Sequence, residues 1–365
     1  MDINQLFQSS GLAPMRALTL TITANCNLSC DHCWPECGRD VALPGIAATI
    51  LLRVIRQFGQ WELPEICLTG GEPLTHPDWM TLVRACCDEG GFQRVRLQSN
   101  ATLLSEEIAK ALSAPEFKKL IIEVSLDGAD AATHDLVRGT GNYELTMHGL
   151  RSLTKAGLGP RVVVAFTEMA HNFDQLPELL AQLKGLGVSR LISGTLVQSG
   201  RASRSLVVRP PTPSQYEALL DRFHRDAEFR ADYRQVGNIA CLEWLTGRSA
   251  SVSEPCRCAE MPYIASDGTL YPCTLLPLKA YGIPGAFSRP LDDVVKQAAG
   301  QWSGLSQWYE RRRTELAPCL ECPGYAHCGG GCLGRACLGG DGFMRVEDRC
   351  ALRRVVYAYK PGLLK

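Results

Sequence analysis

The chain has 365 residues, of which 45% are hydrophobic and 17 are cysteine. This length suits one large domain plus a smaller one, and 38 basic residues balance 38 acidic ones, which excludes a strong overall attraction to nucleic acid or anionic lipid. Because no export-type segment opens the chain and no later apolar run reaches membrane-spanning length, we expect a cytoplasmic protein without a membrane or nucleic-acid partner.

Six short β-rich runs alternate with helical patterns between residue 17 and about residue 197. The runs read ALTLTITA, EICLTG, RVRLQSN, LIIEVSLDG, RVVVAFT and RLISGTLV, and helices are expected at 47–58, 78–89 and 175–186. Strands that each lead into a helix or crossover predict a parallel sheet with right-handed connections. A curved partial barrel and an open doubly wound sheet both fit this pattern. In either fold, reactive residues gather at the carboxyl ends of the strands.

Three closely spaced cysteines follow the first run, in the sequence TANCNLSCDHCWPECG. Cys26, Cys30 and Cys33 lie in a loop at the expected reactive edge. Three thiolates from one loop can bind three irons of a four-iron cluster and leave the fourth iron without a protein ligand. A structural zinc site is the alternative, with Cys37 or His32 as the fourth ligand.

Polar residues follow the next runs at the same expected edge. The paired glycines of LTGGEPL let the backbone approach a ligand closely, and the arginine of HDLVRG can grip a carboxylate in a bidentate fork. Polar groups at successive strand ends around one thiolate loop indicate a binding site. The candidate residues are Gly70, Gly71, Glu72, Pro73, Ser99, Asn100, Ser125, Asp127 and Arg138.

The strand–helix alternation stops at the Arg-, Pro- and Ser-rich stretch 199–215. One helix is expected at 216–229, before a cysteine- and glycine-rich region from about 254 to 350 that has little aliphatic content. With so little apolar material, we expect this region to fold around metal centres. The scattered Cys67, Cys86 and Cys87 are expected to be ordinary core residues instead.

Seven cysteines cluster in the C-terminal region, with the spacings C-x9-G-x4-C, C-x2-C-x5-C-x3-C and a final single cysteine. A zinc knuckle is the simplest structural alternative. Seven ligands exceed one tetrahedral site and are one short of two, which predicts two four-thiolate centres completed by Cys256 or Cys241. The seven are Cys258, Cys273, Cys319, Cys322, Cys328, Cys332 and Cys350.

The motifs CNLSCDHC, GGEP, SNATLL and SLDG…HDLVRG resemble, in this order, those of the radical S-adenosylmethionine (SAM) superfamily. The resemblance covers roughly the first 200 residues. It implies that Cys26, Cys30 and Cys33 bind a [4Fe–4S] cluster whose open iron chelates the amino and carboxylate groups of SAM. Reduction of this cluster would cleave SAM to methionine and a 5′-deoxyadenosyl radical, which abstracts a hydrogen atom from a substrate.

The resemblance also implies roles for the residues at the other strand ends. Gly71 and its neighbours would hold the methionine amino group, and Ser125 and Arg138 would contact the ribose and carboxylate region. Family members often carry an aromatic residue before the third cysteine, where this chain has His32. We expect His32 to pack over the cluster or the adenine, and Cys37 to be a neighbour of the cluster.

The C-terminal spacings resemble those of the SPASM extension, which follows the core of many radical enzymes that modify peptides and proteins. The resemblance implies two auxiliary [4Fe–4S] clusters, hence three clusters in all, with Cys337 as a surplus cysteine. One cluster would use Cys258, Cys273, Cys332 and an upstream cysteine, for which we choose Cys256. The other would use Cys319, Cys322, Cys328 and Cys350.

The expected fold class is therefore α/β, a partial (β/α)6 TIM-like barrel with a C-terminal cysteine-rich iron–sulfur domain. We expect no separate leader-peptide recognition domain, because only about 16 residues precede the first strand. The expected parts are an N-terminal extension at 1–16, a radical SAM core at 17–200, a helical bridge at 201–253, a SPASM domain at 254–350 and a tail at 351–365.

An enzyme of this kind would act on a peptide or protein, with flavodoxin or ferredoxin as its reducing partner. In anaerobic sulfatase maturases, a catalytic aspartate stands where this chain has Thr274, a poor general base, so that activity is disfavoured. Asp127, Glu168 and Asp267 are unassigned candidates for proton transfer. The alternatives are an enzyme of small-molecule or cofactor synthesis, for instance of tetrapyrroles, and a non-catalytic electron-transfer or zinc scaffold.

Overall fold

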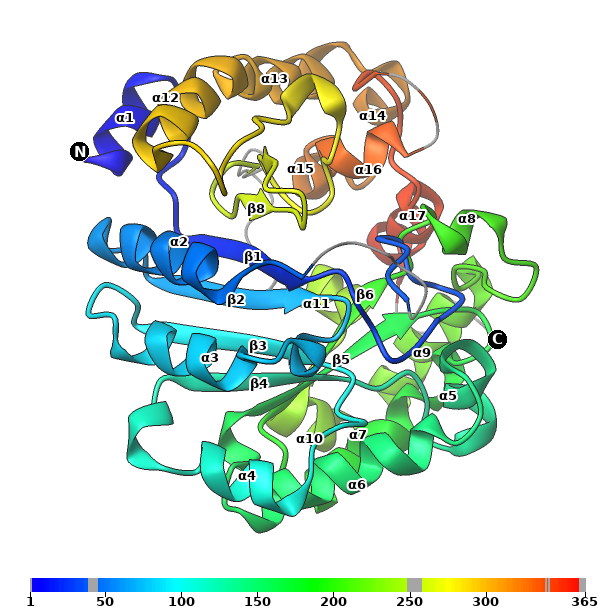
Figure 1. The fold of residues 1–365 in the computed structure, drawn as a ribbon. Coiled ribbons are helices and arrows are strands. Elements are labelled where there is room, and N and C mark those ends of the chain that lie inside the picture. The colour runs from blue at the N-terminus through cyan, green and yellow to red at the C-terminus, as the bar shows by residue number, and fades with distance from the viewer. Residues whose placement is uncertain (1, 39–44, 248–257, 339, 341, 361–365) are drawn as a thin grey trace.

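The computed structural model describes residues 2–38, 45–247, 258–338, 340 and 342–360. Within them, nine strands form one sheet in the order β7-β6-β5-β4-β3-β2-β1-β8-β9 (Figure 1). The six predicted strands are confirmed, and each lies parallel to its neighbours. They are β1 (Ala17–Thr23), β2 (Glu65–Gly70), β3 (Arg94–Ser99), β4 (Leu120–Ser125), β5 (Val162–Glu168) and β6 (Arg190–Thr195).

Helices follow these strands along the chain, as a parallel sheet requires. The predictions at 47–58, 78–89 and 175–186 are confirmed within two residues by α2, α3 and α7. The helices of the barrel are α2 (Ala48–Gln60), α3 (Trp79–Asp88), α4 (Glu106–Leu112), α5 (Ala131–Arg138), α6 (Asn142–Lys155) and α7 (Leu176–Gly185).

Side chains alternate between two very different environments along each strand. In β1, Leu18 and Leu20 are fully buried in the hydrophobic core, whereas Thr19 and Thr21 line an internal cavity. Successive side chains point to opposite faces of a strand, so one face of the sheet packs against helices and the other is polar and hollow. A doubly wound sheet would bury apolar side chains on both faces. The alternation therefore belongs to the curved partial barrel.

The expected single helix at 216–229 is wrong. The chain forms two helices there, α9 (Pro213–Arg225) and α10 (Ala227–Val236). Asp226 separates them with an extended backbone, and its side chain accepts a hydrogen bond from the Phe229 N–H at 2.9 Å. An aspartate that caps a new helix in this way ends the preceding one, a local interaction that helical periodicity does not reveal.

The cysteine-rich region continues the sheet of the barrel. Strand β8 (Tyr263–Ile264) pairs in parallel with β1, and β9 (Leu270–Tyr271) pairs antiparallel with β8. The first part of the rest, coloured yellow to light orange in Figure 1, lies beyond this edge of the sheet, whereas the last part reaches β6, where Arg335 donates to the Thr195 carbonyl. The barrel and the cysteine-rich region therefore share one sheet, and the domain boundaries expected from the sequence stay a prediction.

Our expectation of little apolar core in this region is wrong for its first half. Helix α12 (Leu291–Trp302) buries six apolar side chains. Trp302 also meets Phe7 edge to face, with ring centroids 6.2 Å apart. Phe7 belongs to α1 (Ile3–Ser9), a helix within the expected extension at 1–16. Apolar contacts of this kind stabilise the region in addition to any metal.

Short elements complete the chain. Strand β7 (Gly237–Asn238) extends the sheet beyond β6. The remaining helices are α8 (Arg201–Arg204), α11 (Ala240–Thr246), α13 (Leu305–Glu315), α14 (Ala317–Leu320), α15 (Tyr325–Cys328), α16 (Leu333–Cys337) and α17 (Cys350–Ala358).

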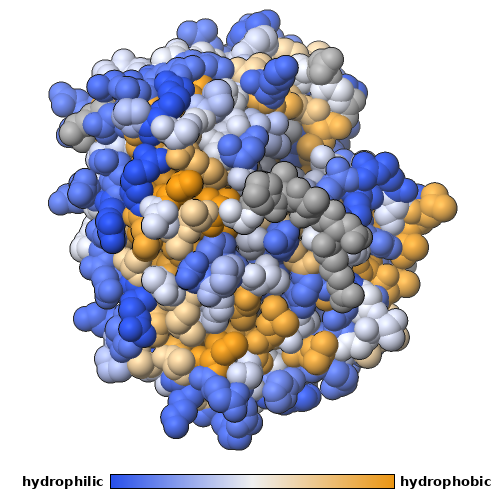
Figure 2. Space-filling model, in the orientation of Figure 1, coloured by the Kyte–Doolittle hydropathy of each residue, from blue (hydrophilic) through white to orange (hydrophobic). Residues whose placement is uncertain are grey.

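The surface carries no single dominant feature on the face shown in Figure 2, where hydrophilic residues surround separate hydrophobic patches. The loop after α8 exposes Leu206, at 89% of its maximum. No helix among the described residues combines the length and the apolar character needed to cross a bilayer.

A buried carboxylate joins β5, β6 and α9. Glu168 is fully buried and accepts hydrogen bonds from Ser193 at 2.5 Å, Thr195 at 3.0 Å and Tyr216 at 2.6 Å. It faces the helices and does not line the cavity. Its three hydroxyl donors identify Glu168 as a structural brace between these elements, away from the cavity where proton transfer to a substrate would take place.

Replacing Tyr216 with phenylalanine should destabilise the fold. Tyr216→Phe removes one donor from a buried charged acceptor, which costs about 2 kcal/mol of unfolding free energy. Anaerobic urea unfolding of the two proteins measures the difference. An unchanged unfolding midpoint would show that Glu168 does not depend on this hydroxyl group.

Candidate active site at the carboxyl ends of the strands

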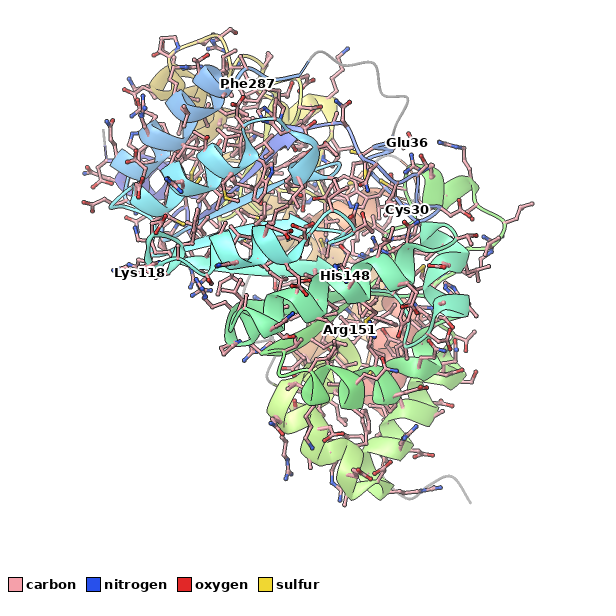
Figure 3. The ribbon with its side chains drawn as sticks, turned by 60° about the horizontal axis from the view of Figure 1, so that its bottom comes forward. Cys30, Glu36, Lys118, His148, Arg151 and Phe287 are labelled. Carbon is pink, nitrogen blue, oxygen red and sulfur yellow. The ribbon has the colours of Figure 1, made fainter. Side chains whose placement is uncertain are left out.

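The loop after β1 carries the first cysteine cluster and is closed on itself. A bridge joins Asn25 to Gly38, and the Cys26 N–H donates to the Gly38 carbonyl at 3.3 Å. Between these ends, Cys26, Cys30 and Cys33 all line one cavity of about 580 Å³. Figure 3 shows Cys30 and Glu36 in this loop, beside the end of the sheet. The structure thus brings the three predicted thiols to one cavity. We call residues 24–38 the cluster loop.

The environment of these thiols differs from one to the next. Burial raises the pKa of Cys26 to about 11, although the Leu28 N–H lies 3.4 Å from its sulfur and favours the thiolate. Burial also raises the pKa of Cys30, which the charge of Arg138 opposes. A hydrogen bond from Cys37 lowers the pKa of Cys33 to about 6. Bound iron would displace the remaining thiol protons, because the thiolate is the ligand.

The donor set suits an iron–sulfur cluster, because three soft thiols from one loop line one cavity. A cube of iron and sulfur spreads three such ligands over three irons. Cys37 lines the same cavity as a fourth thiol.

The GGEP segment approaches the cluster loop so closely that only glycine fits. Gly70 has φ +142°, and a Cβ atom there would lie 2.0 Å from the Thr23 carbonyl oxygen. A Cβ atom on Gly71 would lie 2.2 Å from the Asn25 carbonyl oxygen. The second glycine thus permits backbone contact between the two segments, and the Gly71 N–H donates to the Thr23 carbonyl at 2.9 Å.

Most of the polar residues predicted at the strand ends share the cavity with the thiols. Asn100 also reaches the cluster loop, donating to Asn27 at 2.9 Å, with its amide nitrogen 4.0 Å from the Cys26 sulfur. The predicted residues that line the cavity are Gly70, Gly71, Ser99, Asn100, Ser125 and Arg138.

Glu72 and Pro73 do not line the cavity. Glu72 is fully buried, and its carboxylate accepts from the Leu74 N–H at 3.1 Å, the Ser99 hydroxyl at 2.9 Å and the Asn100 N–H at 2.7 Å. Burial raises its pKa to about 7, against the effect of these donors. Glu72 therefore ties the end of β2 to the end of β3, and it orients the residues that do face the cavity.

Asp127 is also a bracing residue. Its carboxylate accepts from Arg138 at 2.6 Å and from the Thr167 N–H at 2.7 Å, and it lies 3.3 Å from His32. Burial alone would raise the pKa of Asp127, but Arg138 and His32 outweigh it and lower the pKa to about 2. Burial lowers the pKa of His32 to about 4, so this ring is neutral. Asp127 thus fixes Arg138 at the cavity wall.

Sequence reasoning missed the polar interior of the barrel, which forms the rest of the cavity. At its floor, Arg96 donates to Glu65 at 2.8 Å and to Glu123 at 2.8 Å, and Gln98 donates to Glu123 at 2.8 Å. Cys67, expected in the apolar core, lines this cavity as well. The signal was present in the alternation of polar residues in TLTIT and RVRLQS. The interior residues are Thr19, Thr21, Glu65, Cys67, Thr69, Arg96, Gln98, Glu123, Ser125 and Thr167.

The C-terminal region supplies one wall of the same cavity. Met261, Tyr263, Ser266 and Thr274 line it, and the Tyr263 hydroxyl accepts a hydrogen bond from Thr21 at 3.1 Å. Thr274 is thus at the site, although it cannot act as a base. Asp267 does not line the cavity; its side chain accepts from the Thr269 N–H in a turn at 2.9 Å.

Four of the C-terminal cysteines line a second, smaller cavity. Arg353 and Arg354 line it with them. Arg353 has a guanidinium nitrogen 3.7 Å from the Cys328 sulfur, and its guanidinium lies 4.4 Å from the centre of the Trp244 ring. Its other side pairs with Glu347 at 2.7 Å. The cysteines of this cavity are Cys319, Cys322, Cys328 and Cys350, the set predicted for one auxiliary cluster.

The segments of the other predicted set also meet. The Ala259 N–H donates to the Pro272 carbonyl at 2.7 Å, which places the residues after Cys258 beside those before Cys273. Cys332 is the N-cap residue of α16, and this helix packs against Leu275 through Gly334. Cys256 lies outside the described residues. Cys241 is buried in α11.

The amino-acid sequence is similar to those of several known proteins. A sequence profile described as the Radical SAM superfamily matches residues 20–183. The chain is 33% identical to an AdoMet-dependent heme synthase of Methanosarcina barkeri over 210 residues, which are 57% of this chain and 58% of that protein. It is 28% identical to mycofactocin maturase MftC of Mycobacterium tuberculosis over 340 residues, 88% of this chain and 79% of that protein.

Solved structures share the fold over nearly the whole chain. A structure of anSMEcpe with bound AdoMet matches with a TM-score of 0.74 at 18% identity, covering 95% of this chain and 93% of its own. Streptococcus suis SuiB bound to S-adenosylmethionine matches with a TM-score of 0.72 at 17% identity, covering 94% and 78%. The predicted fold class is therefore confirmed.

The buried carboxyl of Glu72 should make stability depend on pH near neutrality. A folded pKa of about 7, above the ordinary 4.5, means that this group stabilises the fold fully below 4.5 and loses that contribution as the pH rises through 7. Between about pH 6 and pH 8.5, the wild type should lose about 1 kcal/mol of stability relative to Glu72→Gln, which cannot ionise. Anaerobic urea unfolding at both pH values measures this difference. If the unfolding free energies of the two proteins change equally with pH, Glu72 does not titrate in this range.

Proposed function

We propose that this chain is a radical SAM enzyme with a SPASM-type C-terminal region, and that it modifies a peptide or protein by hydrogen abstraction; the match of the Radical SAM superfamily profile to residues 20–183 supports this. One observation carries the proposal: Cys26, Cys30 and Cys33 open onto a cavity that the barrel interior and the C-terminal region enclose together. When bound there, a [4Fe–4S] cluster with SAM supplies one-electron cleavage to methionine and a 5′-deoxyadenosyl radical, which takes a substrate hydrogen atom.

The residues around the thiols would bind and orient the cofactors. Gly71, which lines the cavity and lets the backbone of β2 approach the cluster loop, would face the methionine amino group with the backbone beside it. Ser125 would offer a hydroxyl group to the ribose. Arg138, held by Asp127, would give a fixed charge to the carboxylate region. The surrounding walls would keep water from the radical.

Two auxiliary clusters complete the proposal. Cys319, Cys322, Cys328 and Cys350 would hold one [4Fe–4S] cluster, and their shared cavity supports this set. The other would use Cys258, Cys273 and Cys332 with Cys256. Clusters closed by four thiolates would transfer electrons and would not bind substrate.

A peptide substrate has more support than a small molecule. MftC, named a mycofactocin maturase, aligns with 88% of this chain, including the C-terminal region, whereas the heme synthase aligns with 57%. Among the proteins that share the fold, SuiB has been solved with its precursor peptide SuiA. The wall formed by Ser266 and Thr274 offers hydroxyl groups that suit a peptide backbone or polar side chain.

Synthesis of a tetrapyrrole is the second candidate, because the heme synthase has the higher identity. A tetrapyrrole substrate carries several carboxylates and needs free cations. Of the three arginines that line the cavity, Arg96 pairs with two glutamates and Arg138 with Asp127, while Arg201 donates to backbone carbonyls. One arginine without a carboxylate partner among the described residues is too few for several carboxylates, which favours the peptide.

The reducing partner would be a flavodoxin or ferredoxin, since the radical reaction consumes one electron at the cluster. A cytoplasmic enzyme fits this requirement, because thiols stay reduced in that compartment.

The number of irons tests the clusters. Anaerobic reconstitution should give about twelve irons per chain, the content of three four-iron clusters. Cys30→Ala should retain about eight and form no 5′-deoxyadenosine with dithionite and SAM. Cys322→Ala should also lose iron but keep part of this cleavage. Cys86→Ala is the matched control: this buried cysteine of α3 should leave both readouts unchanged.

No more than four irons in the wild type would remove the auxiliary clusters. Equal loss of cleavage in Cys30→Ala and Cys322→Ala, with the fold intact, would refute their separate roles.

A direct comparison of substrates tests the reaction. The reconstituted enzyme, with SAM and dithionite, should change the mass of a precursor peptide encoded beside its gene, and form 5′-deoxyadenosine in proportion. A porphyrinogen offered as the alternative substrate should remain unchanged. Mass spectrometry follows both, and conversion of the tetrapyrrole alone would replace the proposed function with the second candidate.

A further inference from the structure

A segment that follows β6 is fastened to the cluster loop. The Arg201 side chain donates from Nε to the Cys30 carbonyl at 2.8 Å and from Nη2 to the Cys37 carbonyl at 2.7 Å. The Arg201 backbone N–H also donates to the Cys33 carbonyl at 3.2 Å. One residue thus holds the loop at three places, two of which belong to predicted cluster ligands.

The contact between the two segments is close along its length. Gly200 has φ +57°, and a Cβ atom there would lie 2.2 Å from the Trp34 carbonyl oxygen. Arg204, one turn later in α8, pairs with Glu36 of the loop. These two side chains are exposed, at 65% and 45%, so their pairing adds little stability.

The position of Arg201 gives it an electrostatic role as well. Its side chain lines the cavity together with Cys30 and Cys33. Among the described residues, its hydrogen-bond partners are neutral carbonyls, and no carboxylate there pairs with it as Asp127 pairs with Arg138. A cationic group close to a site favours the state of that site with the more negative charge.

We propose that Arg201 is a positioning residue for the iron–sulfur cluster: its guanidinium fork fixes the Cys30–Cys37 part of the loop, and its charge favours the reduced cluster. The proposal rests on the proposed function for the presence of the cluster. The two parts of this role need different chemistry. The fork requires the planar geometry of arginine, whereas any cation at the same place supplies the charge.

Three variants separate these parts. Arg201→Met removes both the fork and the charge, Arg201→Lys keeps the charge alone, and Arg204→Met is the matched control from the same helix. The probes are the reduction potential of the cluster, followed by electron paramagnetic resonance during dithionite titration, and hydrogen exchange of the 24–38 peptide in the anaerobically purified full chain.

Arg201→Met should lower the reduction potential of the cluster by about 59 mV, which is a tenfold change in the equilibrium constant of a one-electron reduction. Its loop amides, including those of Cys26 and Cys33, should exchange about tenfold faster. Arg201→Lys should show the faster exchange with most of the potential retained. Arg204→Met should match the wild type in both measurements.

Identical behaviour of Arg201→Met and Arg204→Met in both measurements would overturn the proposal. A change in exchange without a change in potential would overturn its electrostatic part. The exchange measurement does not require a cluster, so a wild type that binds no iron would refute the proposed function and still report whether Arg201 holds the loop.

Discussion

The alternation of side chains along curved parallel strands is the constraint on which this structure depends. Leu18, Leu20 and Ile22 of β1 pack against the helices, while Thr19 and Thr21 between them face inward. Repeated over five strands, this pattern leaves an interior that is polar and unfilled. The cluster loop and the other strand ends lie at its opening. A hollow barrel is therefore the direct result of polar residues at every second position.

Buried carboxylates hold the parts of the site in place. Glu72 joins two strand ends, Asp127 fixes Arg138, and Glu347 accepts from the Cys332 N–H at 2.9 Å while pairing with two arginines. Burial alone would raise the pKa of Glu347, but Arg349 and Arg353 lower it to about 2. Such groups are costly unless every acceptor is used, so they are placed where the backbone must be fixed.

The C-terminal region is part of the site and of the barrel. Its strand β8 lengthens the sheet, Tyr263 and Thr274 line the cavity, and the buried Arg335 donates to the Thr195 and Leu196 carbonyls at the end of β6. A substrate in the cavity would thus contact both regions. This arrangement explains why the two halves of the chain share one hydrophobic core.

The sequence alone predicted the six strands of the barrel, three of the helices between them and the three cysteines that share one loop at the cavity, because periodicity and ligand spacing are local properties of the chain. The resemblance of the C-terminal spacings implied a shared site for Cys319, Cys322, Cys328 and Cys350, and these four cysteines line one cavity. Tertiary structure decided which polar residues at the strand ends line the cavity and which hold neighbouring strand ends together. Gly71 lines the cavity, whereas the next residue, Glu72, is buried and bonded to the end of β3. It also decided that Arg201 meets Cys30, across 171 positions of the chain. Contacts of that kind depend on how the strands and loops pack, and no local pattern records them.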